Sequence, residues 1–290
     1  IAIFASYCAF EIASRKLRGV AWMLPGALML GGGIWAMHFI GMLAFRIDCG
    51  VTYDRGLTLL SGVPGVLAAA VALRFLRHDS PSTTQLLFSG TVLGGGVGLM
   101  HYTGMAATRL DGIIRYDPLL FFLSIAAAIV LGIGALYLHT RLKQGMHSAW
   151  THRPSLGAGI ILGLAISSMH YIAMEAAFFI PADTGRPVAG ILPSSLGWAV
   201  GLCTFALLAS GMLLTRALAR ATSSRYRFSV ILATTQQAFV VTDRKGRIVD
   251  CNPAFCDMRG DSREGILGDD FGQMVGGEFS TRPGRFRTEV

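Results

Sequence analysis

The chain has 290 residues, of which 52% are hydrophobic and only 14% are charged. Its mean hydropathy of +0.54 excludes an ordinary soluble domain and predicts an integral membrane protein. The net charge of +8 comes from arginines scattered at the ends of apolar segments, so membrane topology explains it better than a nucleic-acid partner does.

Apolar runs of membrane-spanning length follow one another through the first 215 residues. The first segment, residues 1–13, is too short to cross ~30 Å of hydrocarbon and is interpreted as the end of a truncated helix. The longer runs cover residues 20–45, 56–73, 81–108, 118–140, 154–174 and 187–215. Because each crossing needs about 20 apolar residues, this pattern predicts an all-α transmembrane bundle of seven helices.

The connectors between these runs alternate in charge. Those at 15–18, 74–78 and 141–153 are basic, whereas the others carry aspartates mixed with one or two arginines. The positive-inside rule then places the first end of the chain outside and the carboxyl end in the cytoplasm, as in a multi-pass membrane protein. The second, fourth and sixth helices run outward.

Each outward-running helix carries the same short motif, Met-His-aromatic-x-small-Met. The copies are residues 37–42, 100–105 and 169–174, and they recur after 63 and then 69 residues. Self-similarity at such a period predicts internal helix-pair repeats. Every copy falls in the outer half of its helix, so the three histidines are expected at a similar depth.

A histidine inside an apolar helix is costly and suggests a function. In each copy the second methionine follows the histidine by four residues, so imidazole and thioether share one helix face. The pairs are His38 with Met42, His101 with Met105, and His170 with Met174. Nitrogen and thioether sulfur suit copper, especially Cu(I), better than zinc or magnesium.

Several alternatives stay open for these residues. Each histidine can instead be a hydrogen-bonded packing residue, and the small residues Gly41, Gly104 and Ala173 can merely allow close helix contact. The first methionine of each copy either ligates or packs. Tyr102 and Tyr171 either contribute to a site or belong to the interfacial aromatic belt.

The five cysteines form no CxxC pair, so neither a disulfide framework nor a cysteine metal site is expected. The last apolar helix is predicted to continue to about residue 235 as a signalling linker. After it, residues 238–242 and 247–251 are strand-like, a glycine turn joins them, and Asn252-Pro253 begins a helix. The predicted domains are therefore a membrane domain at 1–215, a linker at 216–235 and a cytoplasmic α+β segment at 236–290.

The repeated motifs and their topology resemble the MHYT family of bacterial membrane sensor domains, and the strand-turn-strand-Asn-Pro-helix order resembles the opening of a PAS domain. The first resemblance implies a copper site that senses oxygen, carbon monoxide or nitric oxide. Its implied ligands in this sequence are His38, His101, His170, Met37, Met100, Met169, Tyr102 and Tyr171. The first copy departs from the pattern because Phe39 replaces tyrosine and offers no oxygen.

The sequence thus predicts a sensor of a diatomic gas or of redox state that relays to the PAS segment. Partners are expected to be membrane lipid, the gas, and a second copy of the chain through the linker and PAS segment. No catalytic constellation is visible, and the resemblance implies a cyclic-di-GMP synthesising or degrading domain beyond residue 290. The alternatives are a haem-binding membrane cytochrome, a copper-handling permease and a structural anchor.

Overall fold

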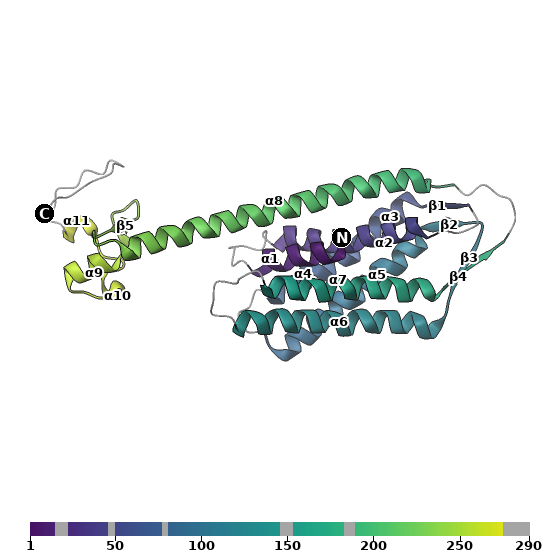
Figure 1. The fold of residues 1–290 in the computed structure, drawn as a ribbon, viewed down its shortest axis with the longest axis horizontal. Helices are drawn as coiled ribbons and strands as arrows, with labels where there is room; N and C mark the ends of the chain where they lie inside the picture. Colours follow the sequence, from purple (N-terminus) through teal and green to yellow (C-terminus); the bar gives the residue numbers. More distant parts are fainter. Residues whose placement is uncertain (15–22, 46–49, 77–80, 146–152, 183–188, 275–290) are drawn as a thin grey trace. The chain divides into compact units, whose positions relative to one another are not determined.

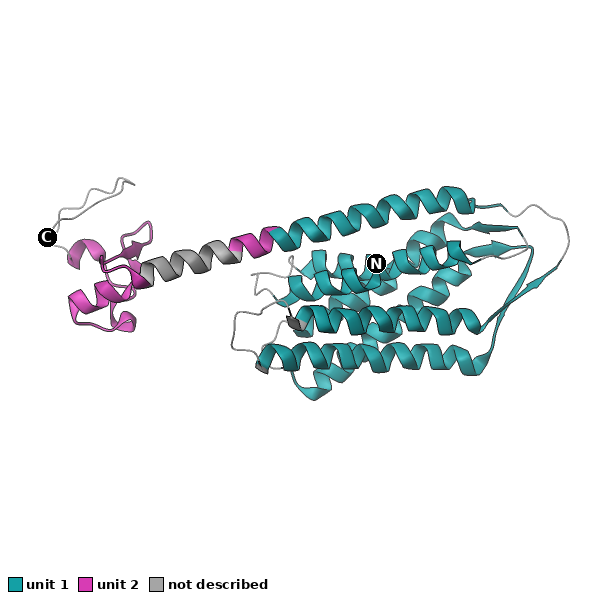
Figure 2. Ribbon diagram, viewed as in Figure 1, with its two compact units in different colours: residues 1–216 teal, residues 217–290 magenta. Residues whose placement is uncertain are grey.

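The computed structural model describes residues 1–14, 23–45, 50–76, 81–145, 153–182 and 189–274. The chain forms two compact units, residues 1–216 and 217–290 (Figure 2). The boundary falls within one long helix, α8 (Pro193–Thr234). Each unit is described by itself.

Six helices of the first unit lie lengthwise beside one another (Figure 1). Their contacts close them into a ring. In ring order they are α1 (Ala2–Ser14), α2 (Met23–Ala44), α4 (Gly62–Leu76), α5 (Thr83–Ala106), α6 (Pro118–Gly145) and α7 (Arg153–Glu175). The three motif helices α2, α5 and α7 alternate with the other three, and they also contact one another. Alternate helices of an up-and-down ring run parallel, so motifs at the same depth meet at its axis.

The ring closes through a glycine that lies seven residues before each histidine. A Cβ atom on any of these glycines would collide with the backbone of the next helix: Val66 of α4 for Gly31, Ile129 of α6 for Gly94, and Ile3 of α1 for Gly163. Small residues let membrane helices approach this closely. The third glycine shows that all three copies of the repeat share the same helix contact.

Helix α8 lies outside the ring and packs on α2. A Cβ on Gly32 of α2 would meet Leu207 of α8, and one on Gly211 of α8 would meet Met29 of α2. On its other side α8 is open, because Trp198 is 77% exposed and Phe205 is 73% exposed. Apolar side chains exposed to this extent fit a lipid-facing surface.

Five described helical segments are long and apolar enough to cross a membrane: Met23–Ala44, Arg55–Leu76, Pro118–Gln144, Ser155–Glu175 and Pro193–Ala221. The second of these joins a short helix, α3 (Arg55–Leu60), to α4. Helix α5 is long enough but carries polar and glycine residues, and α1 has only 13 residues. Seven spans therefore remain a prediction, while a multi-pass bundle is supported. The basic connectors at 15–18, at 77–78 and at 146–152 lie outside the described residues.

The prediction of an all-helical membrane domain missed four short strands beyond the motif ends of the helices. Strand β1 (Val51–Tyr53) pairs antiparallel with β2 (Thr108–Leu110), and β3 (Gly112–Tyr116) pairs antiparallel with β4 (Ala177–Pro181). Runs of three to five residues are too short to show an alternating pattern beside long apolar helices. Their pairing comes from segments far apart in the chain.

Asp54 joins the strand layer to the helices. Its carboxylate accepts a hydrogen bond from the backbone N–H of Leu57 at 3.0 Å and so caps α3. It also pairs with Arg109 of β2 at 3.1 Å. The Leu57 amide and then the Arg109 guanidinium hold the pKa of the Asp54 carboxyl below its ordinary value.

The second unit confirms the strand, turn, strand and capped-helix order that the sequence predicts. Strand β5 (Val240–Thr242) pairs antiparallel with β6 (Ile248–Cys251), and Gly246 takes a positive φ of 81° in the turn between them. Helix α9 (Pro253–Arg259) begins with Asn252 as its cap, and the short helices α10 (Arg263–Ile266) and α11 (Phe271–Met274) follow. Ile248, Cys251, Phe255 and Ile266 form its core.

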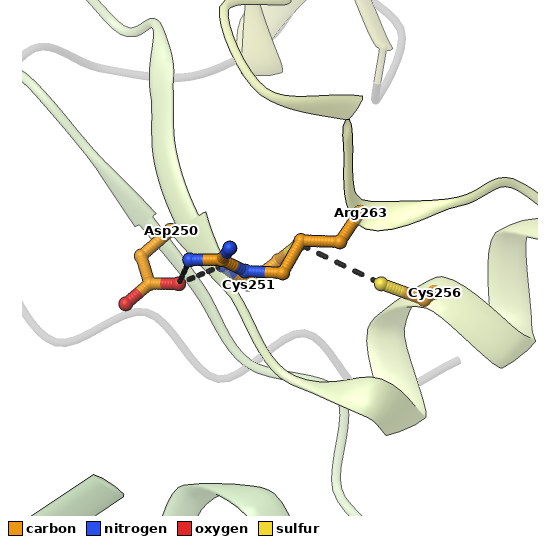
Figure 3. Close-up of polar contacts among 4 residues, drawn as sticks. All are labelled: Asp250, Cys251, Cys256 and Arg263. Carbon is orange, nitrogen blue, oxygen red and sulfur yellow. Dashed lines mark hydrogen bonds and ion pairs between the residues drawn. The ribbon is translucent and has the colours of Figure 1, made fainter. Parts of the chain in front are cut away.

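Two cysteines of this unit lie at the junction of β6 and α9 (Figure 3). The sulfur atoms of Cys251 and Cys256 are 3.7 Å apart, which is too far for a disulfide bond. Burial and the neighbouring thiol raise the pKa of Cys251, so the thiol form is favoured. Beside them Arg263 donates to Asp250 at 2.9 Å. Cys8, Cys203, Cys251 and Cys256 are free thiols.

The glycine contact between α5 and α6 generates a first prediction. Replacing Gly94 by alanine forces the two backbones apart and should lower the unfolding midpoint by about 5 °C, because over-packing costs about 1–3 kcal/mol. The control is Gly95→Ala on the same helix, where a Cβ would meet no described atom within 4 Å. Thermal unfolding in detergent measures both. Equal midpoints for the two variants would contradict the ring contact.

A second prediction concerns the pH dependence of the Asp54 cap. Because the folded pKa lies below the ordinary value of 3.8, the cap stabilises the fold above that pH and is lost as the pH falls through the folded pKa. Asp54→Ala should therefore be less stable than wild type near pH 6, and the difference should shrink as the pH is lowered below 3.8. Asp54→Asn keeps a capping oxygen without the charge and should fall between them. A difference that does not change with pH would exclude the carboxylate as its source.

Candidate metal centre

The three motif histidines meet at the axis of the helix ring. His38 of α2, His101 of α5 and His170 of α7 are each at most 2% exposed. Their Nδ1 atoms form a triangle with sides of 3.0 Å between His38 and His101, 3.4 Å between His38 and His170, and 3.3 Å between His101 and His170. The rings stand nearly perpendicular to one another, at 79–85°.

This triangle has the dimensions of a metal site. A point equidistant from the three nitrogens lies about 1.9 Å from each, close to the metal–imidazole bond length of about 2.0 Å in zinc sites. Where a ring carries its proton on Nδ1, these contacts are N–H···N hydrogen bonds between histidines. Where all three rings turn a lone pair inward, the lone pairs repel one another and a cation at the centre is stabilised by all three. Among the described His, Cys, Asp and Glu side chains, these three form the group that fits a metal ion.

The second methionine of each motif forms a separate layer next to the histidines. Met42, Met105 and Met174 are buried together in one cluster, one helical turn nearer the strands. Ile114 and Tyr116 of β3 and Phe179 of β4 pack against this cluster. Burial, and after it the phenol of Tyr102, raise the pKa of Tyr116 to about 12, so this phenol is uncharged near neutral pH. Histidines, thioethers and strands thus follow one another along the axis.

The first methionine of each motif lies elsewhere. Met100 and Met169 belong to the main hydrophobic core, and Met37 packs against the same core. Met100 faces α4, because its Cγ lies 3.7 Å from where a Cβ on Gly65 would be. The structure therefore groups the second methionines, and not these three, into a cluster of their own.

The motif aromatics point in three different directions. The Tyr102 hydroxyl donates to Ser124 of α6 at 2.8 Å, since Ser124 gives its own proton to the Phe121 carbonyl at 2.7 Å. Tyr171 is 69% exposed on the surface of the unit. Phe39 is fully buried in an apolar cluster with Tyr53 of β1 and Leu196 and Val200 of α8. Ligation of a metal by either tyrosine remains a prediction. The geometry favours a position outside the histidine triangle for both hydroxyls.

Sequence reasoning missed two ionisable residues buried in the ring. Glu11 of α1 is 2% exposed and His139 of α6 is 1% exposed, with its ring stacked on Phe10 at 4.8 Å. Neither belongs to a repeat, which is why the motif search did not find them. His139 is therefore a buried histidine outside the triangle.

Comparison with known proteins supports a signalling role. A family model described as a bacterial signalling protein N-terminal repeat, MHYT, matches residues 31–89, 94–152 and 163–233, and a PAS domain model matches residues 226–288. Each MHYT match begins at or before the glycine of the ring contact and includes one motif. No solved structure is significantly similar to the chain.

Curated relatives are similar over most of this chain. The bifunctional diguanylate cyclase/cyclic di-GMP phosphodiesterase MucR of Pseudomonas aeruginosa is 37% identical over 74% of the chain and 32% of its own length. The cyclic di-GMP phosphodiesterase NbdA of the same organism is 34% identical over 73% of the chain and 28% of its own length. The signaling protein YkoW of Bacillus subtilis is 29% identical over 89% of the chain and 34% of its own length. The chain thus spans about a third of each relative.

The separation of the two methionine sets generates a prediction. Changing Met42, Met105 and Met174 together to leucine should weaken binding of a soft monovalent ion, Cu(I) or Ag(I), by about tenfold or more, because the thioethers beside the triangle are lost. The matched control changes Met37, Met100 and Met169 to leucine, which nearly conserves core volume and should leave the affinity unchanged. Competition against a chelator measures both. The opposite ranking would show that the first methionines are the ligands.

Proposed function

Since this chain belongs to the MHYT family of bacterial signalling proteins, we propose that its membrane unit holds copper at the histidine triangle and senses a diatomic gas or a redox change there. The signal passes through α8 to the PAS unit. The observation that carries the proposal is the set of three buried Nδ1 atoms 3.0–3.4 Å apart. Soft thioethers one turn away favour copper over zinc.

The residues of the chain divide the work. His38, His101 and His170 would hold the ion through Nδ1, and Met42, Met105 and Met174 supply softer donors on the side of the strands. Copper held by these residues would supply the chemistry that the side chains lack, which is binding of a small ligand or a one-electron change. The strands β3 and β4 exclude water from the donors with Ile114, Tyr116 and Phe179. Oxygen, carbon monoxide and nitric oxide are small and apolar enough to pass between these three side chains.

A packed route leads from the triangle to α8. Phe39 follows His38 directly in the chain, and its ring packs against Leu196 and Val200 of α8. A shift of His38 on ligand binding therefore moves Phe39 and so changes the packing of α8 against the ring. A ligand that prefers one arrangement changes the population of the two. Tyrosine at position 39 would bury a hydroxyl in this apolar contact, which explains the phenylalanine.

The output is proposed to be cyclic-di-GMP metabolism in a domain beyond residue 290. MucR and NbdA carry that activity in their names, and the matched region covers only 32% and 28% of their lengths. The PAS unit would then lie in the cytoplasm, next to the inner membrane, and join two copies of the chain. A PAS module that dimerises lets one membrane signal act on a paired output.

The geometry counts against haem. A macrocycle needs its two axial imidazoles on opposite faces, whereas these three nitrogens converge within 3.4 Å of one another with the rings at right angles. A haem macrocycle does not fit between nitrogens this close together.

The decisive measurement is the copper content of detergent-purified protein after mild copper exposure. Wild type should retain about one copper per chain, and the triple variant His38→Ala, His101→Ala, His170→Ala should retain almost none, because all three nitrogen donors are removed. His139→Ala is the matched control, since it also removes a buried imidazole but one outside the triangle. Equal copper in wild type and the triple variant would contradict the proposal.

The sensing step is tested in the full-length protein in membrane vesicles. Cyclic-di-GMP turnover is measured under nitrogen, oxygen, carbon monoxide and nitric oxide, with and without copper. A response to one gas that disappears in the triple variant and persists in His139→Ala supports the proposal. A response that persists in all three proteins would place the sensor elsewhere in the chain.

A further inference from the structure

The two edges of each motif imidazole have different surroundings. The Nδ1 edge faces the axis, as the triangle shows. The Nε2 atoms of His38 and His101 are buried, and no described residue forms a hydrogen bond with either. On the Nε2 side, therefore, packing and not a hydrogen bond to a described residue determines how these two rings lie.

The glycine positions show what holds two of the rings. A Cβ atom on Gly104 of α5 would collide first with Nε2 of His38, which comes from α2. A Cβ on Gly41 of α2 would collide first with Nε2 of His170, which comes from α7. In both cases the nearest atoms are Nε2 and the two ring carbons bonded to it, so the ring meets the neighbouring helix end-on.

These contacts follow one rotational order around the axis. The histidine of α2 lies on the glycine of α5, and the histidine of α7 lies on the glycine of α2. Both glycines stand three residues after the histidine of their own helix. The same order assigns the third histidine, His101 of α5, to Ala173 of α7, which is fully buried at the equivalent place.

We infer that the small residue three positions after each histidine is the seat of the neighbouring motif's imidazole. Glycine at 41 and 104 allows the Nε2 edge to lie against the helix backbone, and this contact leaves Nδ1 as the nitrogen that faces the axis. Gly41, Gly104 and Ala173 are thus positioning residues that never touch the ion. The metal part of the inference rests on the copper site proposed above, and the packing part does not.

The alternative for these glycines is simple helix contact, as at Gly31 and Gly94, whose Cβ positions meet the backbone of a neighbouring helix. Gly41 and Gly104 differ because the nearest atoms belong to a histidine side chain. The two alternatives differ in what they predict for a variant that lacks the histidine. The damage done by a methyl group should disappear when, and only when, the seated imidazole is removed.

A double-mutant cycle on metal-free protein tests this demand. Gly104→Ala should lower the unfolding midpoint by about 5 °C in the wild-type background. In the His38→Ala background the same substitution should have no effect or raise the midpoint, since alanine favours a helix over glycine. In the His170→Ala background the loss should remain. Gly41→Ala should show the reverse dependence, with the loss relieved by His170→Ala and not by His38→Ala.

Gly95→Ala on α5 is the control for adding a methyl group to that helix, and it should not lower the midpoint. If Gly104→Ala yields no folded protein, the monodisperse fraction after purification replaces the midpoint, and recovery by His38→Ala is the supporting result. A loss that persists without His38, or that both histidine variants relieve equally, would overturn the seat.

Copper binding adds a second readout. Gly104→Ala should bind copper about tenfold more weakly than Gly95→Ala, because a displaced ligand ring costs about 10–100-fold in metal affinity. If Gly104→Ala loses stability in the way the cycle predicts but binds copper with unchanged affinity, the packing contact stands and its effect on the ion is overturned. If wild type itself binds no copper, the proposed function fails, and the stability cycle still decides the seat.

Discussion

The convergence of three imidazoles at the axis of the helix ring is the constraint on which the membrane unit depends. Three nitrogen atoms within 3.0–3.4 Å, all buried, cannot be brought together by one helix or by two. They need three parallel helices at equal depth, and an alternating ring of six provides these. The glycines seven residues before the histidines set how closely that ring can pack. A site of this kind therefore forms only when the whole ring forms.

The layers along the axis explain why the motif extends beyond its histidine. One turn after each imidazole comes a methionine, and one further step brings the strands that cover the methionines. The layer of three histidines is followed by a layer of three methionines, one from each motif helix, and the strands lie beyond the methionines. Toward the strands, the imidazoles are followed by thioethers and then by apolar side chains. The strands are thus part of the site's enclosure as well as connections between helices.

Helix α8 does not follow the symmetry of the ring, and it is the helix that continues into the second unit. Six helices complete the ring, and α8 packs outside it against α2. Of the three aromatic residues that follow the histidines, Phe39 is the one buried beneath α8. Tyr102 instead bonds to Ser124 of α6, and Tyr171 is exposed. One copy of the repeat is therefore specialised for contact with the helix that leads to the second unit.

Sequence alone determined the repeat, the helices that carry it, the shared depth of the histidines and the strand-turn-strand start of the second unit. These follow from local periodicity, from the length of each apolar run and from Asn252-Pro253 at a helix start. Only the tertiary structure decided that Nδ1 faces the axis, that Met42, Met105 and Met174 gather while Met100 and Met169 pack in the core, and that β1–β4 cover the site. The reason is that a helix pattern says which residues share a face within one segment. The orientation of a ring and the pairing of short strands depend on contacts between segments about sixty residues apart, which no local pattern contains.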